Sequence, residues 1–286
     1  MEGELWRQVY ALAKQLGKTS GVVRGTYFDV EIIGVYLWSV LHDRPVSWAC
    51  ERRNWCGRCP MKRLPSRSTI SRRLRSEGVQ KLLCMIEKEL LNQRPASWCR
   101  FIDGKPLPIS GHSEDSDAGY GRATGGKAKG YRFHGVFDES QGFVAWRIKP
   151  MNTNESKVAH ELIADLNDPG YLIGDNIFDS NALYDLAGER SIQLIVRRRK
   201  NVQGLGHIRH SPYRLKAIEM MERPFAQSLI AARRRIEMIY SQLTCLAFGL
   251  APLPNWVRTA RRVKNWVRTK LIFFTAYRRR QTTCTV

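Results

Sequence analysis

The middle of the chain alternates between strand-like and helix-like segments, and this pattern restricts the fold more than any other feature of the sequence. Short apolar runs bounded by turn residues predict strands, and apolar residues spaced three or four apart predict helices. The predicted strands are 98–103, 130–138, 143–148, 171–175 and 192–196, and the predicted helices are 154–166 and 180–187. Residues 139–142 form the expected hairpin turn. The resulting order, β-β-β-α-β-α-β, predicts an α/β domain.

The same order predicts which strands are neighbours. Three antiparallel strands followed by parallel strands with helical crossovers is the order of the ribonuclease-H-like fold. In such a sheet the first and fourth strands lie side by side, so their carboxyl ends meet at the edge where α/β sheets place ligands. Asp103 ends the first strand and Asp175 ends the fourth. We therefore expect these two carboxylates to lie close together.

Carboxylates that end buried strands need partners, because burying a charge alone is costly. A third acid from the predicted helix 225–248 would complete an all-oxygen site, and Glu237 is the one acid between Arg223 and the C-terminus. Mg²⁺ prefers hard oxygen ligands, and a pair of ions can activate a water or a 3′-hydroxyl group for in-line phosphoryl transfer. For Glu237 the alternative is a salt bridge with the arginines beside it.

The charge of the chain is concentrated at its two ends. The 47 Lys and Arg residues outnumber the 26 Asp and Glu residues, which gives a net charge of +21. Residues 1–100 carry a net +9, residues 101–194 a net −5 and residues 195–286 a net +17. Basic flanks attract phosphate and an acidic middle supplies metal ligands, as a metal-dependent enzyme acting on nucleic acid requires. A ribosome-associated or merely adhesive protein would explain the flanks but not the middle.

Composition argues against several classes of protein. The 43% of hydrophobic and 26% of charged residues are typical of globular chains rather than disordered ones. The longest apolar stretch, 32–41, is about half the length of a membrane span, and the N-terminus lacks the regions of a secretory signal. The seven cysteines lack framework spacing, and Cys50, Cys56 and Cys59 lack a nearby fourth zinc ligand. We expect a cytoplasmic, nucleoid-associated protein with reduced thiols and no membrane partner.

The first hundred residues are predicted to be helical. Residues 29–42 have the length and apolar character of a buried helix, and shorter helices are expected at 47–53 and 66–75. A short helix, a turn and a polar helix rich in Ser and Arg are typical of a helix-turn-helix that reads the major groove. The expected DNA contacts on the last of these helices are Arg67, Ser71, Arg72 and Arg75. The alternative is a basic surface helix on a packing domain.

Two further basic pairs lie close to the predicted carboxylates. Lys127 and Lys129 precede strand 130–138, and Arg197 and Arg198 follow strand 192–196. We expect these side chains to contact DNA phosphates, and solvated surface charge is the alternative.

Several of these residues lie in motifs that resemble those of the DDE transposases of bacterial insertion sequences. The motifs are Phe-Ile-Asp-Gly at 101–104, the segment 116–131, Gly-Asp-Asn-Ile-Phe-Asp-Ser at 174–180 and Arg-Arg-Arg-Ile-Glu at 233–237. The resemblance covers about residues 25–250. It implies that Asp103, Asp175 and Glu237 form a catalytic, metal-binding triad with two Mg²⁺ (or Mn²⁺) ions, and that Arg233 joins the DNA contacts.

Two positions depart from the pattern of one subgroup of these enzymes. That subgroup has a Tyr three residues before the Arg and a Lys seven residues after the Glu, where this chain has Ile230 and Thr244. The chain therefore belongs to a neighbouring subgroup by resemblance, or it has lost the phosphate contacts that this Tyr and Lys make.

The resemblance also implies a three-part organisation and a DNA substrate. Residues 1–95 are expected to form a helical DNA-binding domain, residues 96–250 a ribonuclease-H-like catalytic domain with an insertion at about 198–225, and residues 251–286 a basic C-terminal tail. The expected activity is metal-dependent cleavage of double-stranded DNA at the ends of an insertion sequence, with strand transfer into target DNA, by a homodimer on paired ends. A hydrolytic nuclease and a non-catalytic DNA-binding protein derived from a transposase are the alternatives.

Overall fold

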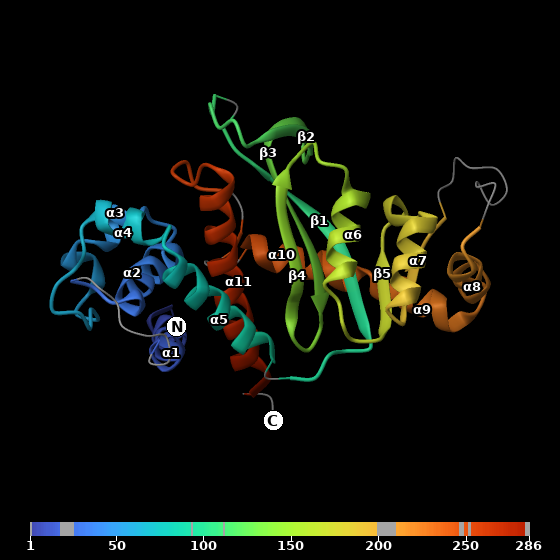
Figure 1. Ribbon diagram of the computed structural model, residues 1–286, viewed down its shortest axis with the longest axis horizontal. Coiled ribbons are helices and arrows are strands. Elements are labelled where there is room, and N and C mark those ends of the chain that lie inside the picture. The colour runs from blue at the N-terminus through green and yellow to red at the C-terminus, as the bar shows by residue number, and fades with distance from the viewer. Residues whose placement is uncertain are drawn as a thin grey trace. The chain divides into compact units, whose positions relative to one another are not determined.

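A six-stranded mixed sheet forms the centre of one part of the protein in the computed structural model (Figure 1). The strands are β1 (Cys99–Pro108), β2 (Gly119–Ala123), β3 (Gly126–Asp138), β4 (Gly142–Pro150), β5 (Gly170–Gly174) and β6 (Ile192–Val196). Their order is β2-β3-β1-β5-β6, and β4 pairs with β3. The pairs β1–β5 and β5–β6 are parallel and the others are antiparallel. This arrangement is the ribonuclease-H-like order, and it confirms that the strands before Asp103 and Asp175 are neighbours.

The chain divides into two units, and the sheet belongs to the second. Unit 1 comprises Met1–Gln93 and Leu243–Val286, and unit 2 comprises Arg94–Gln242. The structure describes residues 2–17, 26–92, 94–110, 112–198, 210–245, 249–250 and 253–283. No helix within these described ranges is both long enough and apolar enough to cross a membrane.

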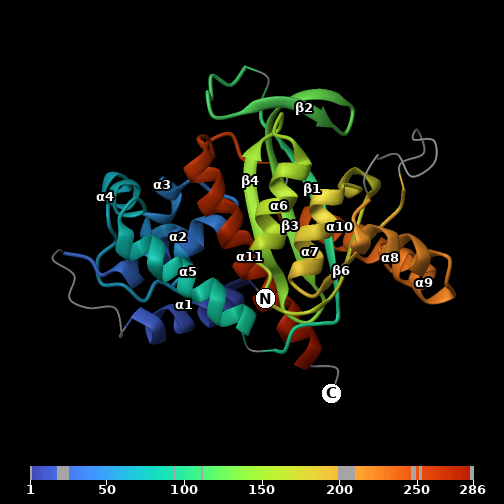
Figure 2. The same ribbon diagram turned by 45° about the vertical axis from the view of Figure 1, so that its right-hand side comes forward.

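Two strands differ from the sequence expectation. Strand β1 continues past Asp103 to Pro108, because it stays paired with β3 as far as Pro108 and Gly130 after its pairing with β5 has ended. The sequence does not predict strand β2, because its residues are mostly Gly, Arg and Ala and do not alternate between apolar and polar. Gly125 and Gly126 connect β2 to β3 with φ values of 91° and 127°, which favour glycine. The β2–β3 ribbon extends beyond the rest of the sheet (Figure 2).

Helices α6 (Glu155–Ala164) and α7 (Asn181–Glu189) cover one face of the sheet (Figure 1). Asn154 caps α6, because its side-chain oxygen accepts a hydrogen bond from the Ser156 backbone N–H at 2.9 Å. Apolar residues of both helices form a continuous core with the strands, including Val158, Leu162 and Leu183 against Ile102 and Leu172. This core fixes β1 and β5 beneath the helices, and so fixes the positions where the two strand-end acids emerge.

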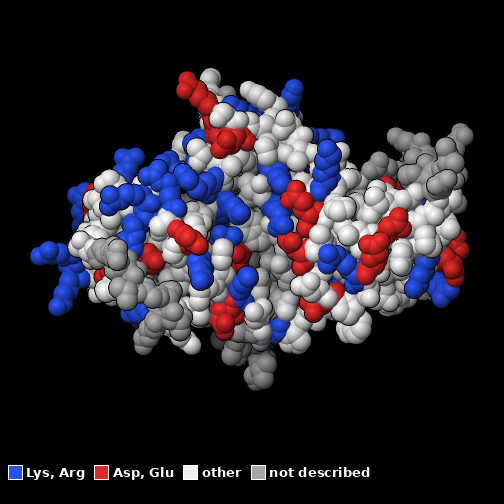
Figure 3. Space-filling view, viewed as in Figure 1, with Lys and Arg blue, Asp and Glu red and all other residues white. Residues whose placement is uncertain are grey.

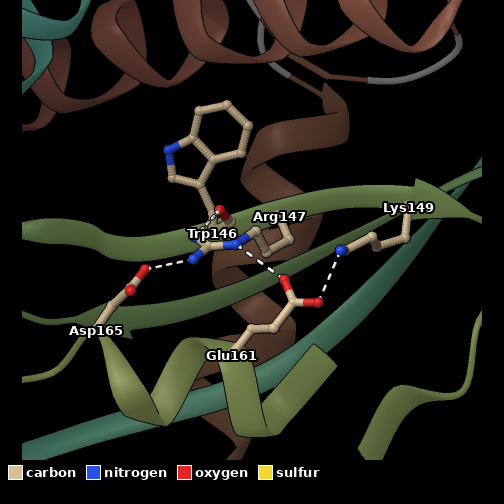
Figure 4. Close-up of polar contacts among 5 residues, drawn as sticks. All are labelled: Trp146, Arg147, Lys149, Glu161 and Asp165. Carbon is tan, nitrogen blue, oxygen red and sulfur yellow. Dashed lines mark hydrogen bonds and ion pairs between the residues drawn. The ribbon is translucent and has the colours of Figure 1, made fainter. Parts of the chain in front are cut away.

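Charged side chains also join α6 to the outer strand β4 (Figure 4). Glu161 accepts from Arg147 at 3.2 Å and from Lys149 at 2.8 Å, and Arg147 reaches Asp165 at 2.7 Å. Hydrogen bonding from Lys149 is the main cause that lowers the pKa of the Glu161 carboxyl. Since these side chains are partly exposed, the network orients α6 and contributes little to the free energy of unfolding.

The segment after β6 differs from the single long helix that the sequence predicts. It contains α8 (Pro212–Met221), α9 (Pro224–Ala232) and α10 (Arg234–Cys245). The break falls at Arg233, where backbone hydrogen bonds three residues apart, Arg233 to Ile230 and Ile236 to Arg233, tighten the turn. The break has no Pro or Gly to mark it, so periodicity alone does not reveal it.

Asp179, which lies just before α7, does not cap this helix. The N-cap of α7 is Ser180, and Asp179 instead forms a buried ion pair with Arg214 of α8, with distances of 2.8 and 3.2 Å from Nε and Nη2. The pair fixes α8 against the start of α7.

Unit 1 is built from helices around an aromatic cluster. Its elements are α1 (Glu2–Gly17), α2 (Asp29–Leu41), α3 (Val46–Ala49), a 3₁₀ turn at Arg52–Trp55, α4 (Arg67–Arg73), α5 (Glu77–Asn92) and α11 (Ala260–Thr283). Trp6 packs against Trp38 and Trp55, and its indole N–H donates to the Gly34 carbonyl at 3.0 Å. A Cβ at Gly34 would lie 2.6 Å from the Tyr10 ring, so only glycine allows this close packing.

Helix α4 forms as predicted, but its connection to the preceding helix is longer than a helix-turn-helix turn. Ser66 caps α4 by accepting from the Thr69 N–H at 3.2 Å, and Ile70 is buried. The segment Cys50 to Ser66, which includes the 3₁₀ turn, separates α3 from α4. A helix-turn-helix uses a turn of about three or four residues.

The C-terminal segment differs from the basic tail that we expected at 251–286. Residues Ala260–Thr283 form α11, which packs on α1, α2 and α5. Apolar residues lie within the basic sequence at helical spacing, and Val263, Val267, Leu271 and Phe274 are buried. Two basic residues on the buried side of α11 form ion pairs with acidic residues. Arg268 pairs with Glu87 at 2.9 Å, and Lys270 pairs with Asp43 at 2.6 Å.

Candidate active site

Asp103 and Asp175 occupy equivalent positions after the parallel pairing of β1 and β5. The last paired residues are Phe101 and Ile173, and each acid follows its paired residue by two positions. Asp103 accepts a hydrogen bond from the Gly104 N–H at 2.8 Å, and Asp175 accepts one from the Asn176 N–H at 2.7 Å. These local bonds hold each carboxylate close to its own backbone, at the point where the two strands separate.

Glu237 reaches the same place from helix α10. Arg233 lies four residues before Glu237 and directs its guanidinium to both acids: Nη2 is 3.9 Å from Asp175 Oδ2 and 3.8 Å from Glu237 Oε1. Two carboxylates from different elements therefore share one positive charge.

Asp103 is the most buried of the three acids, and its protonation is influenced by the others. Burial is the main cause that raises the pKa of its carboxyl, and the negative charges of Asp175 and Glu237 raise it further. The Gly104 N–H and the Arg233 guanidinium act in the opposite direction. A cluster of like charges of this kind favours the binding of a cation.

Tyr240 connects α10 directly to the strand that carries Asp103. Its hydroxyl donates to the Asp103 carbonyl oxygen at 2.9 Å. The ring lies at 6.0 Å from Phe143 and 6.1 Å from Phe133, on the face of the sheet opposite α6. Because Tyr240 follows Glu237 by three residues, this contact sets the height of Glu237 beside the sheet.

A cavity of about 270 Å³ opens beside these groups. Its lining includes Asp175 and Glu237 together with Arg197, Arg233 and Arg234. Carboxylates and guanidinium groups on one cavity wall suit a substrate with phosphate oxygens, since arginine binds phosphate in a bidentate manner.

The donor set fits a hard divalent cation, because it consists of carboxylate oxygens. In the described part of the chain, however, no three Asp, Glu, His or Cys side chains lie close enough together to hold an ion. Arg233 supplies positive charge between Asp175 and Glu237, where a cation would otherwise compensate the two acids.

The other residues predicted to contact DNA are distributed over both units. Arg197 and Arg233 line the cavity beside the acids, and Arg198 is exposed next to them in sequence. Lys127 and Lys129 lie on the β2–β3 ribbon, where Lys129 donates to the Ser113 carbonyl at 2.8 Å and Lys127 lies over the Tyr120 ring. The remaining predicted contacts belong to unit 1: Arg67, Ser71 and Arg75 line a second cavity, and Arg72 is exposed outside its lining.

Sequence reasoning missed Arg234 and Tyr240 in this site. Arg234 follows the first residue of the Arg-x-x-x-Glu motif, and only the turn at Arg233 directs both side chains to the cavity. Tyr240 carries a usable signal, since a residue three positions after Glu237 lies on the same side of a helix.

Comparison with known proteins agrees with the motifs. A protein-family model described as "Transposase DDE domain" matches residues 94–253. No curated protein sequence matches the chain.

Two solved structures are similar to the chain at low identity. The piggyBac transposase in a synaptic complex with hairpin DNA shares 10% identity with a TM-score of 0.47, over 100% of this chain and 73% of that one. The Mos1 transposase in a paired-end complex with the left transposon end shares 12% identity with a TM-score of 0.25, over 89% and 79%. The family match spans more than half of the 286 residues, whereas these two likenesses are too weak to add to it. The chain belongs to the family defined by the transposase DDE domain.

Proposed function

We propose that this protein is a DNA transposase in which Asp103, Asp175 and Glu237 are the catalytic triad. The observation that carries the proposal is that two carboxylates just past the parallel pairing of β1 and β5, and one carboxylate of helix α10, lie beside an arginine-lined cavity. Unit 2 is then the catalytic domain, and unit 1 is the part that binds the ends of the element. The element is a bacterial insertion sequence, and the protein acts as a dimer on paired ends.

The three carboxylates would hold two Mg²⁺ or Mn²⁺ ions, which supply Lewis-acid stabilisation of phosphate oxygens when bound. The residues of the chain perform the remaining tasks. Arg197, Arg233 and Arg234 bind non-bridging oxygens of the scissile phosphate from the cavity wall. Tyr240 positions α10 relative to β1, so that Glu237 faces Asp103.

The proposed reaction consists of two in-line displacements at phosphorus. In the first, a water oxygen attacks the phosphate at the end of the element, the bond to the 3′ oxygen breaks, and that oxygen leaves as a 3′-hydroxyl group. In the second, the freed 3′ oxygen attacks a phosphate of target DNA and displaces another 3′ oxygen, so that one phosphodiester replaces another. A hydrolytic nuclease would perform only the first displacement.

Exposed basic residues of α4 are proposed to recognise the ends. Ser66 caps the helix and Ile70 packs into the unit, so Arg67, Ser71 and Arg72 lie on its other sides, and Arg75 follows its C-cap Leu74. Lys127, Lys129 and Arg198 are proposed to contact the DNA backbone.

The test is a cleavage and strand-transfer assay on duplexes that carry the inverted repeats flanking the gene, with Mg²⁺ or Mn²⁺. Asp103→Asn, Asp175→Asn and Glu237→Gln should each lower the cleavage rate on the order of 10³-fold or more, with DNA binding retained. Glu189→Gln, an exposed acid of α7 outside the cavity lining, is the control and should cleave like the wild type.

The products distinguish the alternatives. Joining of a labelled 3′ end to target DNA supports the transposase, and cleavage without joining identifies a nuclease. Binding without either reaction identifies a non-catalytic derivative, and near-wild-type cleavage by a triad variant removes that residue from the site.

A further inference from the structure

Unit 1 contains a cavity of about 340 Å³ that the catalytic proposal does not use. Its walls come from four places in the chain: α2, the segment 44–47, α4 and the C-terminal segment 256–266. The N-terminal and C-terminal segments that line the cavity are almost two hundred residues apart in sequence. They meet because α11 folds onto the N-terminal helices.

Five arginines line this cavity: Arg44, Arg67, Arg75, Arg261 and Arg262. No Asp or Glu is among its lining residues within the described chain. Figure 3 shows Lys and Arg side chains gathered on the face of unit 1 that carries α3 and α4. The cavity is thus a concentration of positive charge inside an already basic surface.

These five guanidinium groups differ from the arginines that brace the helices of the unit. Among described residues, none of the five forms an ion pair or a side-chain hydrogen bond. By contrast, Arg73 pairs with Asp29 at 2.6 Å, Arg268 with Glu87 at 2.9 Å and Arg280 with Glu4 at 3.0 Å. Arginines that stabilise the unit are neutralised, and those that line the cavity remain available to an external anion.

Other groups of the wall suit a nucleotide strand rather than a bare ion. Trp256 keeps 41% of its surface exposed at the cavity and offers a flat ring for a base or sugar. Trp266 is 3% exposed, and its indole N–H has no hydrogen-bond partner among the described residues. The first turn of α11, which carries Arg261 and Arg262, contains no acid to neutralise the positive end of the helix.

We propose that this cavity binds consecutive phosphates of a DNA strand, and that the C-terminal segment 256–266 supplies part of its wall. Five positive charges exceed what a single phosphate requires and match a run of phosphodiesters. The inference rests on the proposed function, because that function makes DNA the polyanion. It goes further in assigning DNA contact to Arg44, Arg261, Arg262 and Trp256, and in joining them with Arg67 and Arg75 in one site.

The experiment measures binding of a fluorescently labelled duplex to the full-length chain by anisotropy, in EDTA and from 50 to 300 mM KCl. The variants are Arg67→Ala/Arg75→Ala, Arg261→Ala/Arg262→Ala and the quadruple variant. Each pair should weaken binding about tenfold or more at low salt, and reduce the slope of log K against log [salt] by about one for each phosphate that the variant no longer binds. The quadruple variant should bind DNA more weakly than either pair variant, because both pairs contact phosphates of the same strand.

Lys81→Ala/Lys88→Ala provides the matched control, since it removes two exposed charges of α5 that lie outside the cavity lining. Circular dichroism and thermal melting of each variant establish that it is folded. If the arginine pairs behave like this control, the cavity does not bind DNA. If only one of the two pairs affects binding, the two sides of the cavity do not hold the same strand and the shared site is excluded.

Inorganic pyrophosphate distinguishes DNA from a free phosphate compound as the occupant. Micromolar binding of pyrophosphate that the arginine substitutions abolish, with DNA affinity unchanged, would overturn the assignment to DNA. Because these measurements use EDTA and intact DNA, their failure would leave the catalytic triad untouched, and loss of cleavage in triad variants would leave this cavity untouched.

Discussion

The buried ion pair between Asp179 and Arg214 is the most sensitive polar contact of unit 2. The two side chains keep only 5% and 3% of their surface exposed, and hydrogen bonding to Asp179 raises the pKa of the Arg214 guanidinium. Removing one member takes away the ion-pair partner of a buried charge, so Arg214→Ala should lower the free energy of unfolding by about 3–5 kcal/mol in urea denaturation. The exposed pair of Arg223 and Glu219 gives the comparison, and Arg223→Ala should cost less than about 1 kcal/mol. Equal effects would contradict this account.

His134 on β3 makes the stability of the fold depend on pH. Burial, followed by the charges of Arg132 and Lys149, lowers the pKa of its imidazole from 6.5 to about 4, and Glu161 opposes them. Between these values the unfolded chain binds a proton that the folded chain excludes, so stability falls as the pH falls from about 6.5 to 4. The full effect is roughly 3 kcal/mol.

Urea denaturation at a series of pH values tests this contribution. The variant His134→Gln should lose much of the pH dependence across that window. The exposed His160 of α6 serves as control, and His160→Gln should keep the wild-type profile. An unchanged slope in His134→Gln would show that His134 is not the titrating group.

At the scale of elements, helix α10 owes its position to few contacts. Tyr240 holds it to β1, and Arg235 pairs with Glu139 at the β3–β4 turn at 2.7 Å. Tyr240→Phe keeps the ring against Phe143 and removes the hydroxyl that donates to the Asp103 carbonyl. We expect cleavage to slow by about tenfold, since small displacements of reacting groups are costly, with DNA affinity unchanged. Tyr213→Phe on α8 is the control, and wild-type cleavage by Tyr240→Phe would remove the positioning role.

At the scale of the whole molecule, the chain leaves unit 1 at Gln93 and returns to it at Leu243. Helix α11 is therefore part of the core of unit 1 rather than an appendage. Phe273 is completely buried, so Phe273→Ala should lower the free energy of unfolding by about 3–5 kcal/mol. Arg261→Ala on the exposed side of the same helix should change it by less than about 0.5 kcal/mol. A mobile basic tail would give no difference between the two in thermal or urea unfolding.

The sequence by itself determined the elements whose signals are local. The predicted starts of two helices, at residues 154 and 66, coincide with the N-caps of α6 and α4, and the alternating residues of β3 and β4 marked the hairpin. The order of these elements was enough to predict that β1 and β5 are neighbours, because chain connectivity and strand direction leave few arrangements of such a sheet. Asp103 and Asp175 could be selected for the same reason, and Glu237 because it is the one acid between Arg223 and the C-terminus.

Only the tertiary structure decided the features that depend on distant partners. Pairing with β3 extends β1 past Asp103, and the neutralisation of Arg268 and Lys270 by Glu87 and Asp43 makes a basic segment into a buried helix. The position of Arg233 between two acids, and the gathering of five arginines around one cavity, likewise arise from residues far apart in the chain. Local sequence shows that a side chain is charged. Whether that charge is neutralised within the protein or left for a ligand depends on which side chains folding places beside it.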